Sequence, residues 1–183
     1  VIECAGAFIK GVTDAGGIPC GKHFPGHGAC AQDSHTELAV AFDDITPHLE
    51  PYKALVEHMP SIMVGHIEFP MVDETGAPAS RSKTMMNILR NDLNYKGLVV
   101  TDSINMAGFG EPQEELAVEA IAAGVDLLLD PKDPIALAMT LRDAVARGDL
   151  DEERVHQAVG RIDKLIRLSL DTEPAKTRPL VLG

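Results

Sequence analysis

The stretch GLVVTD at positions 97–102 is a short apolar run that ends in a carboxylate. Three other segments repeat this pattern of apolar residues closed by a polar or charged one, at positions 18–23, 61–66 and 125–130. A segment with helical periodicity follows each of the four, at positions 49–57, 83–93, 113–123 and 135–147. Short strands that alternate with helices are typical of βα units around a parallel sheet, whose strands are buried on both faces. We therefore expect an α/β protein with four βα units, half the number in an eight-stranded barrel.

Composition narrows the class of protein. The chain has 183 residues, of which 45% are hydrophobic, and its formal net charge is −12. This size and hydrophobic content suit one globular domain with a core, and no run approaches the roughly 18 apolar residues of a membrane-spanning helix. The negative charge argues against sequence-independent binding to nucleic acid, which requires a basic surface, so an uncharged substrate fits better. The three cysteines match neither a disulfide framework nor a zinc motif, and we expect them to be unpaired.

Both ends of the chain differ from the repeated unit. Residues 1–12 have helical periodicity but lack an initiator methionine, an N-cap and a signal sequence, so we expect a fragment of a longer protein and leave its cellular location open. A last amphipathic helix is expected at 151–168. Residues 171–183 contain proline and show no periodicity, which predicts a tail or linker after a domain that spans residues 1–170.

Titratable side chains gather directly after the first expected strand. Residues 22–28 read KHFPGHG and residues 33–35 read DSH. Because the carboxyl ends of parallel strands meet at one mouth, we expect the first of these motifs to lie near His66 and Asp102, which end later strands. An aspartate after a strand can also simply cap the next helix, so Asp102 alone would not decide the matter. We expect His27 to be structural, since the intervening proline disfavours a helical metal-binding pair.

Four motifs, in this order and spacing, resemble a known family. They are KHFPGHG at 22–28, DSH at 33–35, VGH at 64–66 and GLVVTDSINM at 97–106, and together they are similar to the catalytic domain of family 3 glycoside hydrolases of the β-N-acetylglucosaminidase type. The resemblance runs from residue 1 to about residue 168. It implies a TIM (β/α)8 barrel of which this chain supplies the last four βα units, while the N-terminal half of the barrel is missing from the sequence. It also implies a retaining mechanism without a cofactor or metal.

The resemblance implies a role for each matching residue. Asp102 matches the catalytic nucleophile, His35 matches the acid/base catalyst, and Asp33 matches the residue that orients this histidine. The residues that match sugar-contacting or pocket-lining positions are Lys22, His23, His66 and Met106. Further sugar contacts in the family come from an aspartate and arginines on earlier strands, and none of these is assigned here.

These residue types suit the chemistry of glycoside cleavage. A retaining glycosidase needs an acid that protonates the leaving oxygen and a carboxylate that traps the sugar as a covalent ester. A histidine, whose unperturbed pKa is about 6.5, can give up a proton and take one back near neutrality. Asp33 precedes His35 by two residues, so an extended loop places both side chains on one side, where the carboxylate can fix the tautomer of the ring. The histidine-type motif points to terminal β-linked N-acetylglucosamine, as in peptidoglycan fragments or chitin oligosaccharides.

Other functions stay open at this point. One is a β-glucosidase or a phosphorylase of the same family, because a histidine repels a phosphate acceptor less than a glutamate would. Another is an inactive half-barrel with a binding or structural role. A third is a zinc hydrolase on the same barrel, for which the candidate ligands would be His23, His27, His35, His66 and Asp102.

Overall fold

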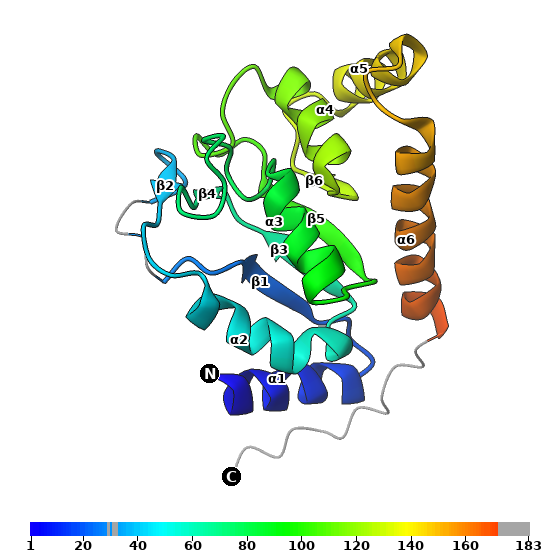
Figure 1. The fold of residues 1–183 in the computed structure, drawn as a ribbon. Helices are drawn as coiled ribbons and strands as arrows, with labels where there is room; N and C mark the ends of the chain where they lie inside the picture. The colour runs from blue at the N-terminus through cyan, green and yellow to red at the C-terminus, as the bar shows by residue number, and fades with distance from the viewer. Residues whose placement is uncertain (29, 31–32, 172–183) are drawn as a thin grey trace.

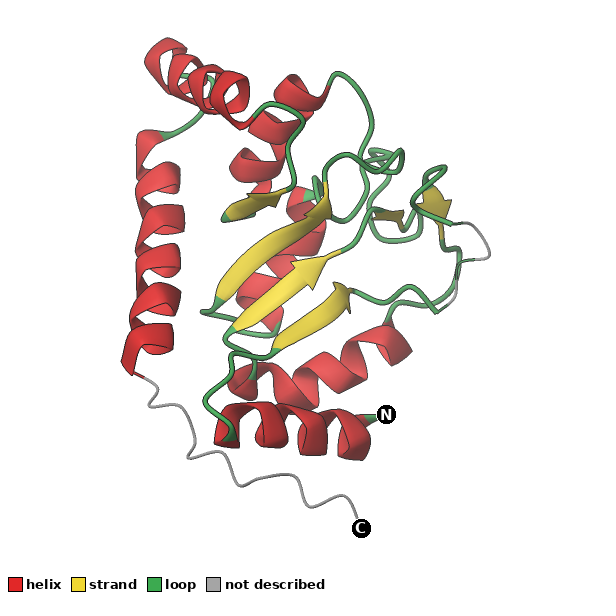
Figure 2. Cartoon of the chain, turned by 180° about the vertical axis from the view of Figure 1, so that it is seen from behind, coloured by secondary structure: helices red, strands yellow, loops and turns green. Residues whose placement is uncertain are grey.

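The chain forms a parallel sheet with helices on one of its faces (Figures 1 and 2). The computed structural model describes residues 1–28, 30 and 33–171, so the expected tail at 171–183 lies almost entirely outside the described residues. The sheet has four parallel strands in the order β1-β3-β5-β6. Their bounds are β1 Cys20–Phe24, β3 Ser61–Val64, β5 Leu98–Ser103 and β6 Leu127–Leu129. The predicted α/β class with a parallel sheet is confirmed.

The predicted helices are present, with shifted ends. They are α1 Ile2–Asp14, α2 Thr46–Leu55 with a 3-10 turn at Val56–His58, α3 Lys83–Asn87 with a π turn at Ile88–Asp92, α4 Gln113–Ala123, α5 Pro134–Arg147 and α6 Glu152–Asp171. Side chains begin two of them: the Ser82 hydroxyl accepts the N–H of Met85 at 3.0 Å, and Asp133 accepts two N–H groups at the start of α5. These are the N-caps that satisfy the free donors of a first turn.

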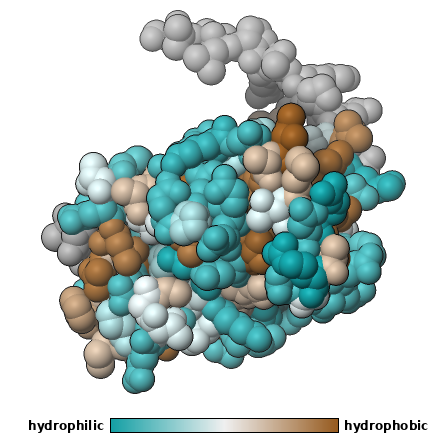
Figure 3. Space-filling model, turned by 90° about the horizontal axis from the view of Figure 1, so that it is seen from above, coloured by the Kyte–Doolittle hydropathy of each residue, from teal (hydrophilic) through white to brown (hydrophobic). Residues whose placement is uncertain are grey.

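The core lies between the sheet and the helices α2, α3 and α4, which cover one face (Figure 1). The other face, turned to the viewer in Figure 2, carries no helix among the described residues. The prediction that every strand is buried on both faces is therefore wrong for the edge strands. Strand β5 is largely buried, whereas Leu127 and Leu129 of β6 are 39% and 37% exposed, because no second layer covers them here. The surface seen from above is mostly hydrophilic (Figure 3), so polarity alone does not mark a site on it.

A second, two-stranded sheet was not predicted. Strand β2, Ala39–Val40, pairs in parallel with β4, Ile67–Glu68, and the N–H of Ala41 extends the pairing to Glu68 at 2.9 Å. Two-residue strands are too short to show any periodicity in a sequence. This sheet ties the chain that follows the DSH motif to the chain that follows β3.

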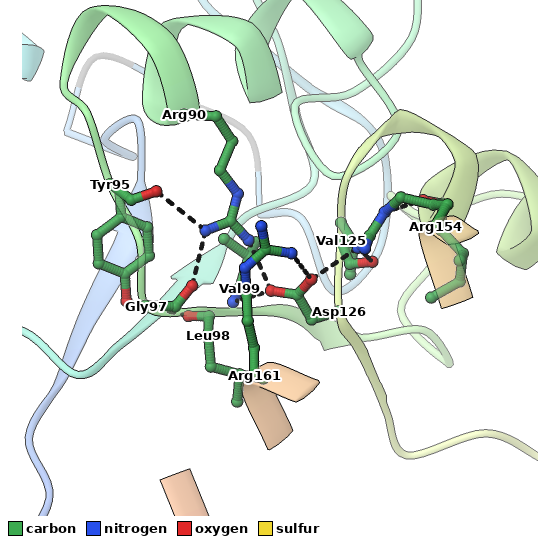
Figure 4. Close-up of polar contacts among 10 residues, drawn as sticks. Arg90, Tyr95, Gly97, Leu98, Val99, Val125, Asp126, Arg154 and Arg161 are labelled. Carbon is green, nitrogen blue, oxygen red and sulfur yellow. Dashed lines mark hydrogen bonds and ion pairs between the residues drawn. The ribbon is translucent and has the colours of Figure 1, made fainter. Parts of the chain in front are cut away.

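A buried ion cluster joins the amino ends of two strands to helix α6 (Figure 4). The side chain of Asp126 is fully buried and accepts hydrogen bonds from Arg90 at 2.6 Å, Arg154 at 2.6 Å and Arg161 at 2.9 Å. It also accepts the backbone N–H of Val99 at 2.9 Å. Arg154 and Arg161 belong to α6, so this carboxylate holds the last helix against the sheet, at the end of β5 that lies away from Asp102.

Candidate active site

The carboxylate of Asp102 lies at the carboxyl end of β5. Its Oδ1 accepts the backbone N–H of Ser103 at 2.8 Å, and its Oδ2 lies 3.4 Å from Nε2 of His23, at the end of β1. Strand β3 separates β1 from β5, so these two side chains meet across it, as the strand-end positions predicted. Burial lowers the pKa of His23, and the nearby Asp102 charge opposes this effect. The peptide bond between Lys22, which is exposed, and His23 is cis.

Asp33 and His35 form a hydrogen-bonded pair. Oδ1 of Asp33 lies 2.7 Å from Nδ1 of His35 and also accepts the backbone N–H of the same histidine at 3.0 Å. The backbone hydrogen bond, followed by the side-chain one, lowers the pKa of Asp33. An ionised carboxylate accepts hydrogen bonds only, so Nδ1 carries the proton and Nε2 is the nitrogen that faces away from Asp33. Both side chains are exposed, His35 by 74% and Asp33 by 64%.

Main-chain hydrogen bonds attach this pair to the chain that follows Asp102. The N–H of Ala107 donates to the carbonyl of His35 at 3.4 Å, and the N–H of Gly108 donates to the carbonyl of Ser34 at 3.2 Å. A Cβ at Gly108 would lie 3.0 Å from that Ser34 carbonyl, so a larger residue would crowd this close approach. His27, expected to be structural, lies with Nε2 3.1 Å from the Ser34 hydroxyl. The fold thus places the Asp33–His35 loop against the segment that carries Asp102.

The structure corrects the role expected for His66. This side chain is fully buried at the end of β3, with Nε2 3.0 Å from the carbonyl of Ser103 and Nδ1 2.8 Å from the hydroxyl of Ser80. Both ring nitrogens are used within the chain, so neither is free for a sugar hydroxyl. Met106 is also buried, with 8% of its surface exposed, and offers a sugar little contact area.

Polar residues near Asp102 form a network that sequence reasoning missed. The hydroxyl of Ser103 donates to Oδ2 of Asp130 at 2.8 Å, and Nδ2 of Asn105 donates to the Asp130 carbonyl at 2.6 Å. The first of these bonds is the main cause that lowers the pKa of Asp130. Asp130 follows β6 and has a positive φ of 59°. Its place at the end of an apolar strand was the available signal, but its partner became visible only in the fold.

Two further features bear on function. Among the described residues, no group of three or more His, Cys, Asp and Glu side chains is arranged to hold a metal ion, so the zinc alternative has no ligand set in this part of the chain. Within the same residues, no helix is long and apolar enough to cross a membrane. The cysteines Cys4, Cys20 and Cys30 are unpaired, as expected.

Residues 1–165 match the family model described as "Glycosyl hydrolase family 3 N terminal domain". A β-hexosaminidase from Idiomarina loihiensis is 36% identical over 138 residues, which cover 70% of this chain and 41% of that protein. The chain thus spans about two fifths of the length of this relative.

Two solved structures are similar in fold and sequence. A family 3 β-N-acetylglucosaminidase from Paenibacillus sp. FPU-7 superposes with a TM-score of 0.82 and 32% identity, over 94% of this chain and 35% of that one. A β-glucoside phosphorylase, BglX, superposes with a TM-score of 0.85 and 30% identity, over 98% of this chain and 36% of that one. On the family match and these similarities, the chain belongs to glycoside hydrolase family 3, and its residues 1–165 match the N-terminal domain of that family.

Proposed function

We propose that this chain carries the nucleophile and the acid/base catalyst of a retaining glycoside hydrolase that releases terminal β-linked N-acetylglucosamine. The observation that carries the proposal is the hydrogen-bonded Asp33–His35 pair, which lies on a loop bonded through main-chain groups to the segment that follows Asp102. A carboxylate beside a histidine–aspartate pair supplies the two groups that a retaining mechanism uses. The names of the β-hexosaminidase and β-N-acetylglucosaminidase relatives support the substrate class.

The first chemical step forms a glycosyl ester. Asp102 attacks the anomeric carbon with one carboxylate oxygen while the bond from that carbon to the leaving oxygen breaks. The protonated Nε2 of His35 donates its proton to the leaving oxygen, and Asp33 holds the proton on Nδ1 throughout. The backbone N–H of Ser103 fixes the carboxylate during the attack through its bond to Oδ1.

The second step returns the enzyme to its starting state. A water molecule attacks the anomeric carbon, and the neutral Nε2 of His35 takes the proton that the water loses. The ester bond to Asp102 breaks, and the carboxylate is free again. Because the pKa of Asp33 is lowered, this residue stays ionised at neutral pH and balances the positive charge that the imidazole gains and loses.

Two residues at the end of β1 are proposed to hold the sugar. Lys22 is exposed and can donate hydrogen bonds to hydroxyl groups. His23 lies beside Asp102, where one ring nitrogen can contact a hydroxyl close to the reacting carbon. Met106 keeps only a minor role as an apolar surface, since it is mostly buried.

We further propose that residues 1–170 are the C-terminal half of a (β/α)8 barrel and that the preceding half of the protein completes it. Within the described residues, β1 and β6 each pair on one side only. One face of the sheet carries no helix in the part of the chain that the structure describes (Figure 2), and Leu127 and Leu129 of β6 are exposed. A closed barrel would bury such leucines in its interior. The expected partners are therefore the missing half and a carbohydrate substrate, while 171–183 as a tail or linker stays a prediction.

The test is to trap the covalent intermediate in the complete protein that contains this chain. A fluorinated glycosyl fluoride that accumulates the glycosyl-enzyme should label the peptide that includes Asp102, and Asp102→Asn should abolish the label. Label on any other carboxylate would contradict the assignment. The turnover rate of a truncated protein that begins at this chain, compared with that of the complete protein, would show whether the preceding half is needed.

Phosphorolysis is a second candidate, favoured by the high similarity to the β-glucoside phosphorylase. In that reaction phosphate replaces water in the second step, and the product is a sugar 1-phosphate. Turnover that requires phosphate and yields this product would establish a phosphorylase. Activity on β-glucosides that exceeds activity on β-N-acetylglucosaminides would point to glucose as the sugar.

A further inference from the structure

Ser103 lies at the centre of the contacts around the proposed nucleophile. Its N–H donates to Oδ1 of Asp102 at 2.8 Å, and its hydroxyl donates to Asp130 at 2.8 Å. Its carbonyl accepts the N–H of Met106 at 3.1 Å and a hydrogen bond from Nε2 of His66 at 3.0 Å. The main chain on both sides of this residue is thus fixed, and the direction of its N–H sets the position of the Asp102 carboxylate.

Of the hydrogen bonds to Ser103, the one from His66 comes from a buried side chain that follows the neighbouring strand β3. A carbonyl can only accept, so Nε2 of this ring carries the proton, and Nδ1 accepts from the Ser80 hydroxyl at 2.8 Å. The ring is fully buried and packs edge to face against Phe109, with centroids 5.3 Å apart. These contacts fix one tautomer and one orientation of the ring.

The same histidine also contacts the segment that holds the acid/base loop. A Cβ at Gly108 would lie 3.0 Å from Cβ of His66 and 3.0 Å from the carbonyl of Ser34, to which the Gly108 N–H donates. The side chain of His66 therefore lies close to Gly108 in the segment after Asp102, and the N–H of Gly108 in turn donates to Ser34, between Asp33 and His35.

We propose, on the basis of the function proposed above, that His66 is a positioning residue, which fixes the Ser103 peptide and so the placement of Asp102 relative to His35. Retaining glycosidases that use two carboxyl groups hold them about 5–5.5 Å apart, which shows how closely the spacing of the two catalytic groups is set. A misplacement of about 1 Å can lower a rate about 10²-fold. A buried hydrogen bond from a neighbouring strand is a suitable means of holding this spacing.

Two substitutions separate positioning from packing. In His66→Gln the amide nitrogen lies at about the reach of Nε2 and can still donate to the Ser103 carbonyl. In His66→Asn the amide is shorter and reaches only the Ser80 side. Both variants lose the aromatic packing on Phe109, so their stability should fall by similar amounts. Ser82→Ala is the control, because it removes a buried hydroxyl that bonds Met85 and Asp73 and has no hydrogen bond to His66 or Ser103.

The measurements are kcat and KM on an aryl β-N-acetylglucosaminide, made on the complete protein and corrected for the folded fraction. His66→Asn should lower kcat about 10²-fold with KM nearly unchanged, His66→Gln should recover at least about a tenth of the wild-type kcat, and Ser82→Ala should lower only stability. Equal losses in the glutamine and asparagine variants, or an unchanged kcat in the asparagine variant, would overturn the proposal.

Crystal structures of the wild type and of His66→Asn give a readout that does not depend on turnover. The proposal requires the Ser103 peptide and the Asp102 carboxylate to move in the asparagine variant, and unmoved atoms would overturn it. If the wild type fails to cleave any β-N-acetylglucosaminide, the proposed function fails, and this comparison still decides the role of His66.

Discussion

Replacement of Asp126 with alanine should be among the most destabilising single changes in this chain. The carboxylate is fully buried and accepts hydrogen bonds from Arg90, Arg154 and Arg161 (Figure 4). Removing one partner of a buried ion pair typically costs about 3–5 kcal/mol, because the other charge stays buried without compensation. The buried N–H of Val99 would also lose its acceptor, which adds about 1–3 kcal/mol. We therefore expect a loss of at least about 4 kcal/mol in the free energy of unfolding.

The assay is urea-induced unfolding of the complete protein, with the slope m compared between variants so that a change in the unfolded state is recognised. Asp126→Asn should lose less, because the amide oxygen still accepts one or two of the same hydrogen bonds. Asp14→Ala is the matched control: it breaks a pair with Lys10 at 2.6 Å, which is as short but largely exposed. Exposed pairs contribute only about 0–1 kcal/mol.

The effect of salt on the unfolding free energy of the two variants gives a second comparison. At about 0.5 M NaCl the loss in Asp126→Ala should persist, because buried pairs are screened far less than exposed ones. A loss below about 1 kcal/mol, comparable to that of the Asp14 control, would refute the reasoning, since it would mean that the arginines find other partners or solvent at no cost.

Three other predictions concern the candidate site. His35→Ala should slow turnover by about 10²–10⁴-fold for substrates with poor leaving groups and much less for activated aryl glycosides; an equal loss for both would reject it as the acid. Burial lowers the pKa of both His66 and His23, so the unfolded chain takes up protons below about pH 6.5 that the folded chain does not. The free energy of unfolding should therefore be highest above that pH and fall as the pH drops, by up to about 1.4 kcal/mol per pH unit for the buried His66 and less for the half-buried His23. A urea midpoint that is constant from pH 7 to pH 5.5 would contradict this. Gly108→Ala should lower both stability and kcat, because the new Cβ would lie 3.0 Å from the Ser34 carbonyl and from His66; an alanine variant with wild-type kinetics would show that the two segments need no close contact.

Local features of the site could be predicted from the sequence because they depend on residues close together in the chain. The two-residue spacing of Asp33 and His35 was enough to predict their pairing, which the 2.7 Å contact bears out. The place of Asp102 at the end of an apolar run predicted its position at the carboxyl edge of the sheet, near the end of β1. The extended loop expected for the first pair is wrong, since residues 34–36 form a turn in which the N–H of Thr36 donates to the carbonyl of Asp33 at 3.0 Å. The second prediction follows from strand geometry.

The two-stranded sheet β2–β4 and the exposed face of β6 could not be predicted in this way. Strands of two residues leave no periodic pattern, so the pairing of Ala39 with Ile67 is visible only in the fold. Leu127 and Leu129 look like core residues in the sequence, and their exposure follows from the layer that is absent over that face among the described residues.

The sequence by itself determined the alternation of strands and helices, the family motifs and the aspartate–histidine pair, because each depends on a periodic pattern or on residues a few positions apart. Tertiary structure alone decided that His66 donates to Ser103 rather than to a ligand, and that Asp126 collects three arginines from two distant elements. The physical reason is the same in both cases. Whether a polar group is buried, and which partner satisfies it there, depends on segments that meet only when the chain packs.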